Sequence, residues 1–449
     1  MESSTTIATT GLRPPALTLP DEASVRWNSL TKAVRQPEQY WPAQLCERPI
    51  ITGRVRDRVI ALIADPAAAQ TVLTGPESQF PKWRIYERVV GAGMGRENLS
   101  AGSGLRWQRQ RQAFAPLFSA AAAVGMAPLF RTAAEQAMAE WGAANEIEID
   151  AGFEMTQITL GIIWRVLFGA DIDAAAPRFV TAAARAIYDA QLRGDIDAPA
   201  AKISELADAA RDVAATAGLP AANPFRAWAP STAGDPARLA DQELYDNARN
   251  FLAAGHETTA LTLIWSLWLT AQDPDTQDRI YREIDAVVGS GPIEDNHIDH
   301  LAFVGQVIKE AMRLFPPGFV TVRRAGQPAT LAGESLPAGS ILVVCIYALH
   351  RHRDWWDAPN LFRPERFATG EPRHRYAYLP FSAGPHACIG ARFAWREVIV
   401  LFASILLRFR LSTDPHSAIR PRAGITIRPD REVRLMLERR KPTGDQRRR

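Results

Sequence analysis

Cysteine is scarce in this chain, and so are the usual marks of a secreted or membrane-anchored protein. Its 449 residues include only three cysteines, Cys46, Cys345 and Cys388, which are too few and too scattered for a disulfide framework or a cysteine-based zinc site. The first twenty residues contain no apolar segment of the kind found in signal peptides. We therefore expect no signal peptide, no N-terminal membrane anchor and a cytoplasmic protein with reduced thiols.

Excess charge of one sign, internal repeats and linkers are also missing. The 52 Lys and Arg residues nearly balance 49 Asp and Glu residues, and without a dense basic stripe we expect no nucleic-acid partner. A hydrophobic content of 47% provides ample material for a large core. We expect one domain over residues 1–449 and a monomer, with residues 1–75 rich in coil and strand and residues 76–449 mainly helical.

One apolar stretch, residues 251–271, has about the length of a membrane span. His256 and Glu257 lie inside it, and ionisable groups there would be costly in lipid. The stretch therefore predicts a helix buried in the core, with Asp241 as its N-cap and its end near Ala271, before Asp273 and Pro274. At about 1.5 Å per residue such a helix is roughly 45 Å long.

The remaining pattern indicates a mainly α protein with small β-sheets. Residues 104–290 read as mostly helical, with a loop at 217–240. Further elements are expected as helices at 300–315 and 389–407, strands at 58–64, 319–323 and 341–346, and a C-terminal hairpin near Ile425 and Val433.

Cys388 lies between Gly384 and Gly390, just before the last expected helix. The helix N-terminus and nearby backbone N–H groups favour the thiolate form of a cysteine placed there. A thiolate is also an axial ligand of haem iron. Taken alone, a single cysteine is more often a buried structural residue, and that alternative remains open at this point.

The expected long helix contains Ala254-Gly255-His256-Glu257-Thr258-Thr259. An acid beside a hydroxyl, after a glycine, can open a helix locally and admit a proton-carrying water. The His-Glu pair does not form the zinc-protease motif, because Ala260 stands where that motif needs histidine. Alternatively, Thr258 bonds to the carbonyl one turn earlier and Glu257 is an internal salt-bridge partner.

Glu310 and Arg313 are spaced to share one face of a helix. Such a pair usually lies on the surface and contributes under about 1 kcal/mol. A third partner would convert it into a buried, bidentate network. Arg366, in Pro364-Glu365-Arg366-Phe367, is the candidate for that partner.

These four motifs, in this order, resemble those of the cytochrome P450 family. They are the Ala-Gly-x-Glu-Thr-Thr helix, the Glu-x-x-Arg helix, the Pro-Glu-Arg-Phe turn and the Phe-x-x-Gly-x-x-x-Cys-x-Gly loop that runs from Phe381 to Gly390. The resemblance is clear from residue 104 to the C-terminus and loose over the first hundred residues. It implies the cytochrome P450 fold, with a long central helix over a haem b group.

The resemblance also implies site roles. Cys388 would be the axial thiolate ligand of the haem iron, within a loop that includes Phe381 and Gly390. Thr258 and Glu257 would deliver protons to bound dioxygen, while Glu310, Arg313 and Arg366 would form a structural network. The expected haem propionate contacts are Trp107, Arg111, Arg323 and His386.

For two of these expected propionate contacts, another residue could bind the propionate instead. Arg324 could replace Arg323 as the propionate contact. His386 stands where many family members carry arginine, and histidine titrates near neutral pH. We therefore predict a propionate contact at His386 whose strength depends on pH, with other groups holding the propionate as the alternative.

The substrate pocket is sketched by the same resemblance. Expected wall residues are Ala253, Ala254, Phe319, Val320, Ile425 and Thr426, with residues 83–98 as a loop over the pocket. The mostly apolar wall predicts a hydrophobic small-molecule substrate. Arg84 or Arg88 could anchor a carboxylate, which slightly favours fatty acids.

The implied reaction is insertion of one oxygen atom from O2 into the substrate by a soluble, bacterial-type monooxygenase. Electrons would come from a ferredoxin and a ferredoxin reductase, steered by a basic face for which Arg106, Arg109, Arg392 and Arg396 are candidates. The alternatives are a peroxide-driven peroxygenase, a haem-dependent isomerase and a non-catalytic thiolate-haem sensor. The Glu257–Thr258 pair argues against the peroxide-driven and isomerase alternatives.

Overall fold

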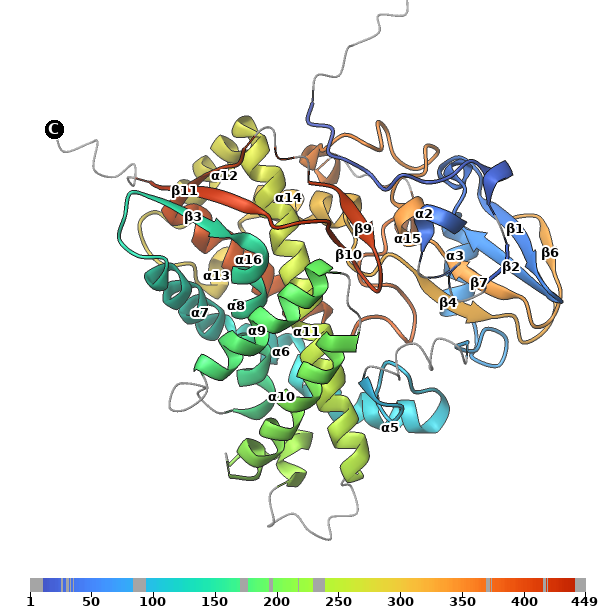
Figure 1. Ribbon diagram of the computed structural model, residues 1–449, viewed down its shortest axis with the longest axis horizontal. Coiled ribbons are helices and arrows are strands. Elements are labelled where there is room, and N and C mark those ends of the chain that lie inside the picture. Colours follow the sequence, from blue (N-terminus) through green and yellow to red (C-terminus); the bar gives the residue numbers. More distant parts are fainter. Residues whose placement is uncertain are drawn as a thin grey trace, which may run out of the picture.

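Figure 1 shows the computed structural model, in which a large helical part adjoins a smaller part built around a sheet. The sheet-rich part contains the first strands of the chain, and the helical part surrounds the long helix α11 (Asp241–Gln272). The structure describes residues 11–440 except 26, 30, 31, 33, 35, 84–93, 170–176, 194–196, 217, 229–238, 369–371, 373, 415, 416 and 418.

Helices make up most of the described chain, as the sequence predicts. Besides α11, they are α2 (Pro37–Tyr40), α3 (Pro66–Thr74), α5 (Gly104–Phe114), α6 (Ala120–Gly125), α7 (Ala127–Glu140), α8 (Ala151–Phe168), α9 (Pro177–Arg193), α10 (Asp197–Thr216), α12 (Pro274–Val287), α13 (Asp295–Ile298), α14 (Ala302–Leu314), α15 (Ile346–Leu349) and α16 (Ala391–Arg408).

The strands form small sheets. The largest has the order β1-β2-β7-β4, a second has the order β3-β11-β8, and β9–β10 and β5–β6 are two-stranded. Their bounds are β1 (Ile50–Val55), β2 (Arg58–Ile63), β3 (Glu146–Asp150), β4 (Thr321–Arg324), β5 (Ala329–Leu331), β6 (Glu334–Leu336), β7 (Ile341–Val344), β8 (Phe409–Ser412), β9 (Pro421–Ala423), β10 (Ile427–Pro429) and β11 (Arg434–Arg439).

Helix α11 is buried along most of its length and crosses the helical part (Figure 1). Its cap differs from the prediction, because Ala240 precedes the first turn and Asp241 lies inside it. The carboxylate of Glu243 instead accepts a hydrogen bond from the Ala240 N–H at 3.0 Å. Asp273 ends the helix and caps α12 by accepting from the Thr276 N–H.

Two expected features of the chain differ in the structure. β3 interrupts the region read as helical, and its alternating sequence Glu-Ile-Glu-Ile-Asp is a strand pattern that the helical prediction overlooked. The predicted C-terminal hairpin is present around Ile425, where β9 and β10 form an antiparallel pair. Val433 does not belong to it, because the following strand β11 pairs with β3 and β8.

The first strands are joined to a strand from late in the chain. β2 pairs in parallel with β7, so that Ile60 lies beside Ile341 and Ile63 beside Val344. β7 then pairs with β4. This four-stranded sheet therefore links the beginning of the chain to the segment that carries Arg323.

No single helix among the described residues is both long enough and apolar enough to cross a membrane. One bent pair, Gly104–Gly125 with Ala127–Glu140, meets the requirement jointly by length and composition.

Candidate active site

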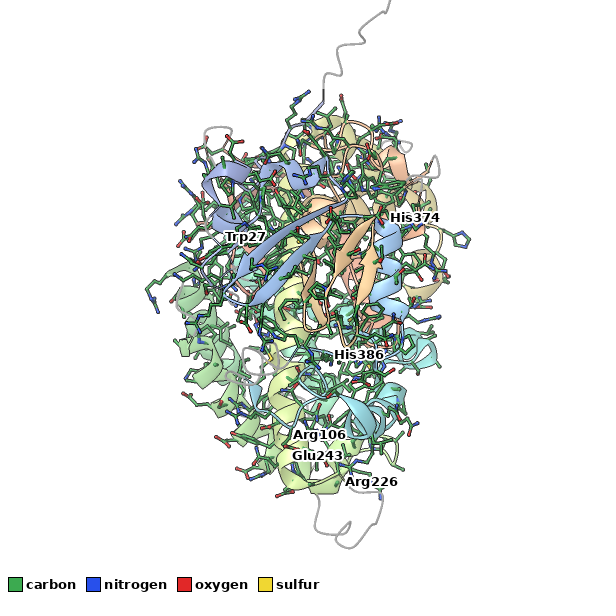
Figure 2. All side chains as sticks on the ribbon, turned by 90° about the vertical axis from the view of Figure 1, so that its right-hand side faces the viewer. Trp27, Arg106, Arg226, Glu243, His374 and His386 are labelled. Atoms are coloured by element: carbon green, nitrogen blue, oxygen red, sulfur yellow. The ribbon has the colours of Figure 1, made fainter. Side chains whose placement is uncertain are left out.

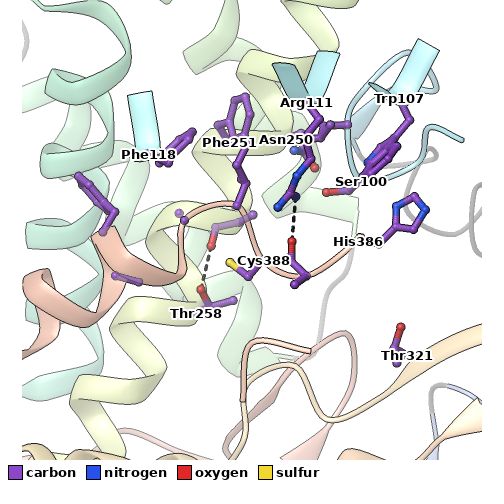
Figure 3. Close-up of a pocket in the computed structure, with 18 of the residues that line it drawn as sticks. Ser100, Trp107, Arg111, Phe118, Asn250, Phe251, Thr258, Thr321, His386 and Cys388 are labelled. Atoms are coloured by element: carbon purple, nitrogen blue, oxygen red, sulfur yellow. Dashed lines mark hydrogen bonds between the residues drawn. The ribbon is translucent and has the colours of Figure 1, made fainter. Parts of the chain in front are cut away.

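A cavity lies between α11, α5, the start of α16 and the loop before α16 (Figure 3). It contains about 980 Å³ of empty space, which includes space open to solvent. Its wall brings together eight of the residues singled out in the sequence: Trp107, Arg111, Ala254, Thr258, Arg323, His386, Cys388 and Gly390.

The loop before α16 holds the Cys388 thiol at the cavity wall. The Cys388 N–H donates to the carbonyl of Phe381 at 3.0 Å, which folds the loop back on itself. Gly384 has φ +75°, and a Cβ there would lie 2.0 Å from the carbonyl oxygen of Leu73. The loop therefore requires glycine at position 384, for its backbone conformation and for its contact with α3.

The protonation of Cys388 differs from the sequence-based prediction. The thiol is accessible from the cavity, but the protein packed around it disfavours the charged form and raises its pKa above the ordinary value. A hydrogen bond from the Gly390 N–H and the charge of Arg111 only partly oppose this. The helix start therefore does not produce a thiolate by itself. A bound metal ion would deprotonate the thiol directly.

Basic side chains gather at one end of the cavity. The rings of Trp107 and His386 are in contact, with centroids 4.0 Å apart and planes tilted by 43°. The Arg111 guanidinium lies 5.9 Å from the Trp107 ring and donates to the Ala387 carbonyl at 2.8 Å. Arg323 is buried in the wall, whereas Arg324 is exposed, so the structure favours Arg323 over its neighbour.

Lys82 belongs to the same basic cluster, although the sequence offered no signal for it. Its Nζ donates to the carbonyls of Ser100 and Gly102 at 3.0 and 2.8 Å. An isolated β-bridge joins Lys82 to Arg323. Only the folded backbone therefore brings Lys82 into the cavity wall, from a position 241 residues before Arg323.

His386 lies where the four-stranded sheet meets the helices (Figure 2). Burial, together with the charges of Lys82, Arg323 and Arg111, lowers its pKa to about 3. On these contacts the imidazole is neutral from pH 6 to 9, so they do not support the predicted change of charge near neutral pH. Its Nδ1 is buried and has no hydrogen-bond partner among the described residues.

The acid and the hydroxyl on α11 face different surroundings. The Thr258 hydroxyl faces the cavity and donates to the Ala254 carbonyl at 2.9 Å (Figure 3), which is the local alternative left open by the sequence. Glu257 lines a second, smaller cavity, where its carboxylate accepts from Thr426 at 2.6 Å and from Arg428 at 2.7 Å. Helix α11 is continuous here, so the predicted local opening is not observed.

The structure brings Glu310, Arg313 and Arg366 together in a fully buried network. Glu310 accepts two hydrogen bonds from Arg313, at 2.7 and 2.8 Å, and one from Arg366 at 3.0 Å. The guanidinium of Arg313 also reaches the carbonyls of His350, Pro359 and Leu361. Burial opposes ionisation of Glu310, but the two arginines outweigh it and lower the pKa of the carboxyl.

Most of the expected substrate-pocket residues lie elsewhere. Ala254 lines the cavity, whereas Ala253, Phe319, Val320, Ile425 and Thr426 are absent from its described wall. Phe319 packs on Trp41, Ile425 is 45% exposed, and Thr426 is bonded to Glu257. Family position alone does not show which way a side chain points.

Two further expectations concern loop residues. Arg84 and Arg88 lie outside the described residues, as does most of the expected loop at 83–98. Phe381 lines a groove on another face of the Cys388 loop rather than the cavity.

The expected basic face is largely engaged in internal ion pairs. Arg106 pairs with Glu97, Arg109 with Glu243 and Arg396 with Asp295. Figure 2 shows Arg106 and Glu243 in the helical part, below His386. The fourth candidate, Arg392, is exposed, and no ion pair is seen for it in the described part of the chain.

Haem b fits the residues around this cavity. The Cys388 thiol at the wall would supply one protein ligand to the haem iron. Arg111, Arg323 and Lys82 offer positive charge to carboxylates at the same end, and the unpaired Nδ1 of His386 can accept or donate there. Burying two carboxylates without partners is costly, and the three positive charges at this end would offset that cost.

Comparison with known proteins agrees with this geometry. Residues 20–191 and 226–431 match the family described as cytochrome P450. The chain is 40% identical over 201 residues to the taurochenodeoxycholic 6 alpha-hydroxylase of Sus scrofa, which covers 44% of this chain and 40% of that enzyme. It is 36% identical over 206 residues to cytochrome P450 4A14 of Rattus norvegicus, covering 45% and 41%, and 38% identical over 203 residues to cytochrome P450 4A11 of Homo sapiens, covering 45% and 39%.

These alignments span about two fifths of the length of the mammalian relatives. They lend no support to the predicted bacterial type. The family match, by contrast, extends over most of the chain and includes every residue of the cavity wall. The chain belongs to the cytochrome P450 family.

Proposed function

We propose that this chain is a haem-thiolate monooxygenase that inserts one oxygen atom from O2 into a mostly apolar small molecule. The observation that carries the proposal is the position of Cys388, whose thiol faces the same cavity as Thr258 and a cluster of cations. Haem b, held by this thiol, would supply the activation of dioxygen. Family membership supports both the cofactor and the reaction class.

Each residue of the cavity has a separate task in this proposal. Arg111, Arg323 and Lys82 would neutralise the haem propionates, and Trp107 would support the His386 ring beside them. Thr258 would hold a water molecule at its Oγ1 and pass a proton into the cavity. The apolar part of the wall would exclude bulk water and hold the substrate.

Glu257 would act from the far side of α11. Its carboxylate is bound by Arg428 and Thr426, so it would have to be released from them before it could relay a proton toward Thr258. The alternative is a purely structural ion pair. The variant Glu257→Gln separates these roles. If Glu257 relays protons, the variant loses turnover; if Glu257 only forms an ion pair, the variant chiefly loses stability.

The reaction requires two electrons and two protons for each O2, with the second oxygen leaving as water. We propose an external donor, either a ferredoxin with its reductase or an NADPH-dependent flavoprotein reductase. We also propose a monomer in the cytoplasm. The peroxygenase, isomerase and sensor alternatives remain distinct outcomes of the tests below.

The first test is an absorption spectrum of the purified protein, reduced with dithionite and exposed to carbon monoxide. A strongly red-shifted Soret band is expected for a haem with a thiolate ligand. Cys388→His should lose this shift, whereas Cys46→Ser, outside the cavity, should retain it. A colourless protein, or a histidine-type spectrum in the parent protein, would contradict the proposal.

The second test is turnover of a panel of apolar substrates with alternative electron sources. A monooxygenase forms hydroxylated or epoxidised product with NADPH, a reductase and O2. Product only with hydrogen peroxide would identify a peroxygenase. Rearranged product without any electron donor would identify an isomerase, and haem binding without turnover would favour a sensor.

A further inference from the structure

One polar side chain in the cavity wall has no role in the site described above. Asn250 lies on α11, two turns before Thr258, and is 2% exposed. Its Oδ1 is buried and has no hydrogen-bond partner among the described residues. Figure 3 shows this side chain on the cavity side of α11, together with Phe251. A buried amide without a partner costs folding free energy unless a ligand satisfies it.

Ser100 supplies a second polar group to the same wall. Its segment is fastened to α11, because the Leu99 N–H donates to Asn247 Oδ1 at 2.9 Å and the Glu97 N–H donates to Asp246 Oδ2 at 2.8 Å. Ser100 follows Leu99 directly, and Asn250 lies one turn beyond Asn247 on α11.

The Ser100 hydroxyl is free to bind a ligand. Its carbonyl is occupied by Lys82, but within the described residues the hydroxyl makes no hydrogen bond to another side chain or to the backbone. Ser100 and Asn250 line the same cavity, and Figure 3 shows both near Arg111 and Trp107 in that view. The two side chains therefore offer a hydroxyl and an amide to one region of the cavity.

The chemistry of this pair indicates what it binds. The amide offers an acceptor oxygen and a donor NH2 group, and the serine hydroxyl can do both. Neither group is charged, and the cations at this end of the cavity are suited to the haem carboxylates. A neutral group that donates and accepts at the same atom satisfies both side chains, and an alcohol has that property.

We propose that Asn250 and Ser100 form a polar subsite that selects apolar substrates carrying a hydroxyl group. This inference rests on the proposed function and names the substrate class for the same site. The substrate hydroxyl would donate to the Asn250 amide oxygen and accept from the Ser100 hydroxyl. A substrate of the same shape without the hydroxyl would leave the buried amide unpaired, and a site of this kind discriminates strongly against such an analogue.

The test compares two rigid probes of similar size, 1-adamantanol and 1-methyladamantane. Their dissociation constants are measured on the haem-loaded protein by the change in its Soret band and independently by calorimetry. The ratio of the two constants gives the preference for the hydroxyl. Asn250→Leu, which keeps the size of the side chain, should reduce this preference by about fivefold to tenfold, chiefly by weakening the alcohol.

Ile163→Val is the matched control, because it trims an apolar residue of the same wall. It should affect both probes alike and leave their ratio unchanged. Ser100→Ala should lower the preference by about twofold or more, and it leaves α11 intact if Asn250→Leu does not fold. An unchanged ratio in Ser100→Ala, or in a folded Asn250→Leu, overturns the subsite.

The spectrum with carbon monoxide separates the two proposals. A thiolate-haem spectrum with no effect of these variants on the ratio overturns the subsite and leaves the proposed function standing. A parent protein that binds the alcohol preferentially by calorimetry, but shows no thiolate-haem spectrum, overturns the proposed function and leaves the subsite standing.

Discussion

Ser382 and Gly384 share a left-handed backbone conformation in the loop before Cys388. Their φ angles are +59° and +75°, a region in which a residue with a side chain is strained by roughly 1–2 kcal/mol. Gly384 avoids that strain and also the carbonyl of Leu73. Ser382 therefore adopts the unfavourable conformation without the freedom of glycine, in the loop that carries Cys388.

Ser382→Gly is accordingly expected to stabilise the protein. The relief of strain exceeds the entropy that glycine adds to the unfolded chain, which leaves a gain of about 0.5–1 kcal/mol in the free energy of unfolding. Urea denaturation followed by tryptophan fluorescence measures the change. Gly384→Ala is the opposing variant and should lose about 2–4 kcal/mol. A loss of stability in Ser382→Gly would show that the serine side chain supports the loop.

At the scale of elements, Glu310 joins α14 to the 3-10 turn Pro364–Phe367. The carboxylate binds Arg313 on its own helix and Arg366 on the turn, while the Arg363 N–H donates to it at 2.9 Å. All three charged side chains are buried. Removing the one negative charge would leave two buried cations without an anion, which is the costly way to break a buried ion pair.

Glu310→Gln is therefore expected to lose about 3–5 kcal/mol of stability at pH 7. The folded-state pKa of Glu310 lies below its ordinary value of 4.5, so its contribution is complete well above pH 4.5 and is lost as the pH falls through the folded-state pKa. The difference between parent and variant should shrink in acid. Urea denaturation from pH 7 down to pH 3 measures it, with Glu334→Gln, an exposed carboxylate, as the control. A difference that is independent of pH would contradict the argument.

Helix α11 also shows how one element serves two cavities. Thr258 and Glu257 are consecutive, so their side chains leave the helix about 100° apart. One therefore lines the cavity of Cys388 and the other meets Arg428 and Thr426. Neighbouring positions in a motif are thus placed in different chemical surroundings by the helix itself.

At the scale of the whole molecule, β2 and β7 connect distant parts of the chain. They form a parallel pair in the middle of the four-stranded sheet, although some 280 residues separate them. Arg323 on β4 belongs to the same sheet and to the cavity wall. Because the sheet contributes to the cavity wall that α11 also lines, we expect the sheet, the cavity and the helical core to unfold together rather than as separate units.

Equilibrium unfolding in urea should accordingly give coincident transitions by two probes. Tryptophan fluorescence reports mainly on the helical core, where Trp265 stacks on Phe315 with ring centroids 3.9 Å apart. A fluorescent label on Cys46, which lies just before β1, reports on the sheet-rich part in a variant with Cys345→Ser and Cys388→Ser. Both probes are read on the haem-free protein, because Cys388→Ser removes the proposed haem ligand. Two transitions at separate urea concentrations would mean that the sheet-rich part unfolds on its own.

The sequence by itself determined the helical class, the long buried helix and the identity of the thiol, because these depend on local periodicity and on motifs of fixed spacing. Strand β2 and the span of α14 could be read in the same way. The alternating residues of β3 carried a signal too, but the helical pattern around them obscured it. A motif also identified the three members of the buried charge network.

Only the tertiary structure decided which side chains meet. Lys82 joins Arg323 through backbone pairing, Glu257 turns away from the cavity toward Arg428, and the protein packed around Cys388 raises the pKa of its thiol. That the buried Oδ1 of Asn250 has no hydrogen-bond partner among the described residues can be recognised only in the folded structure. Contacts, burial and pKa values depend on groups far apart in the chain, and local sequence therefore carries no direct record of them.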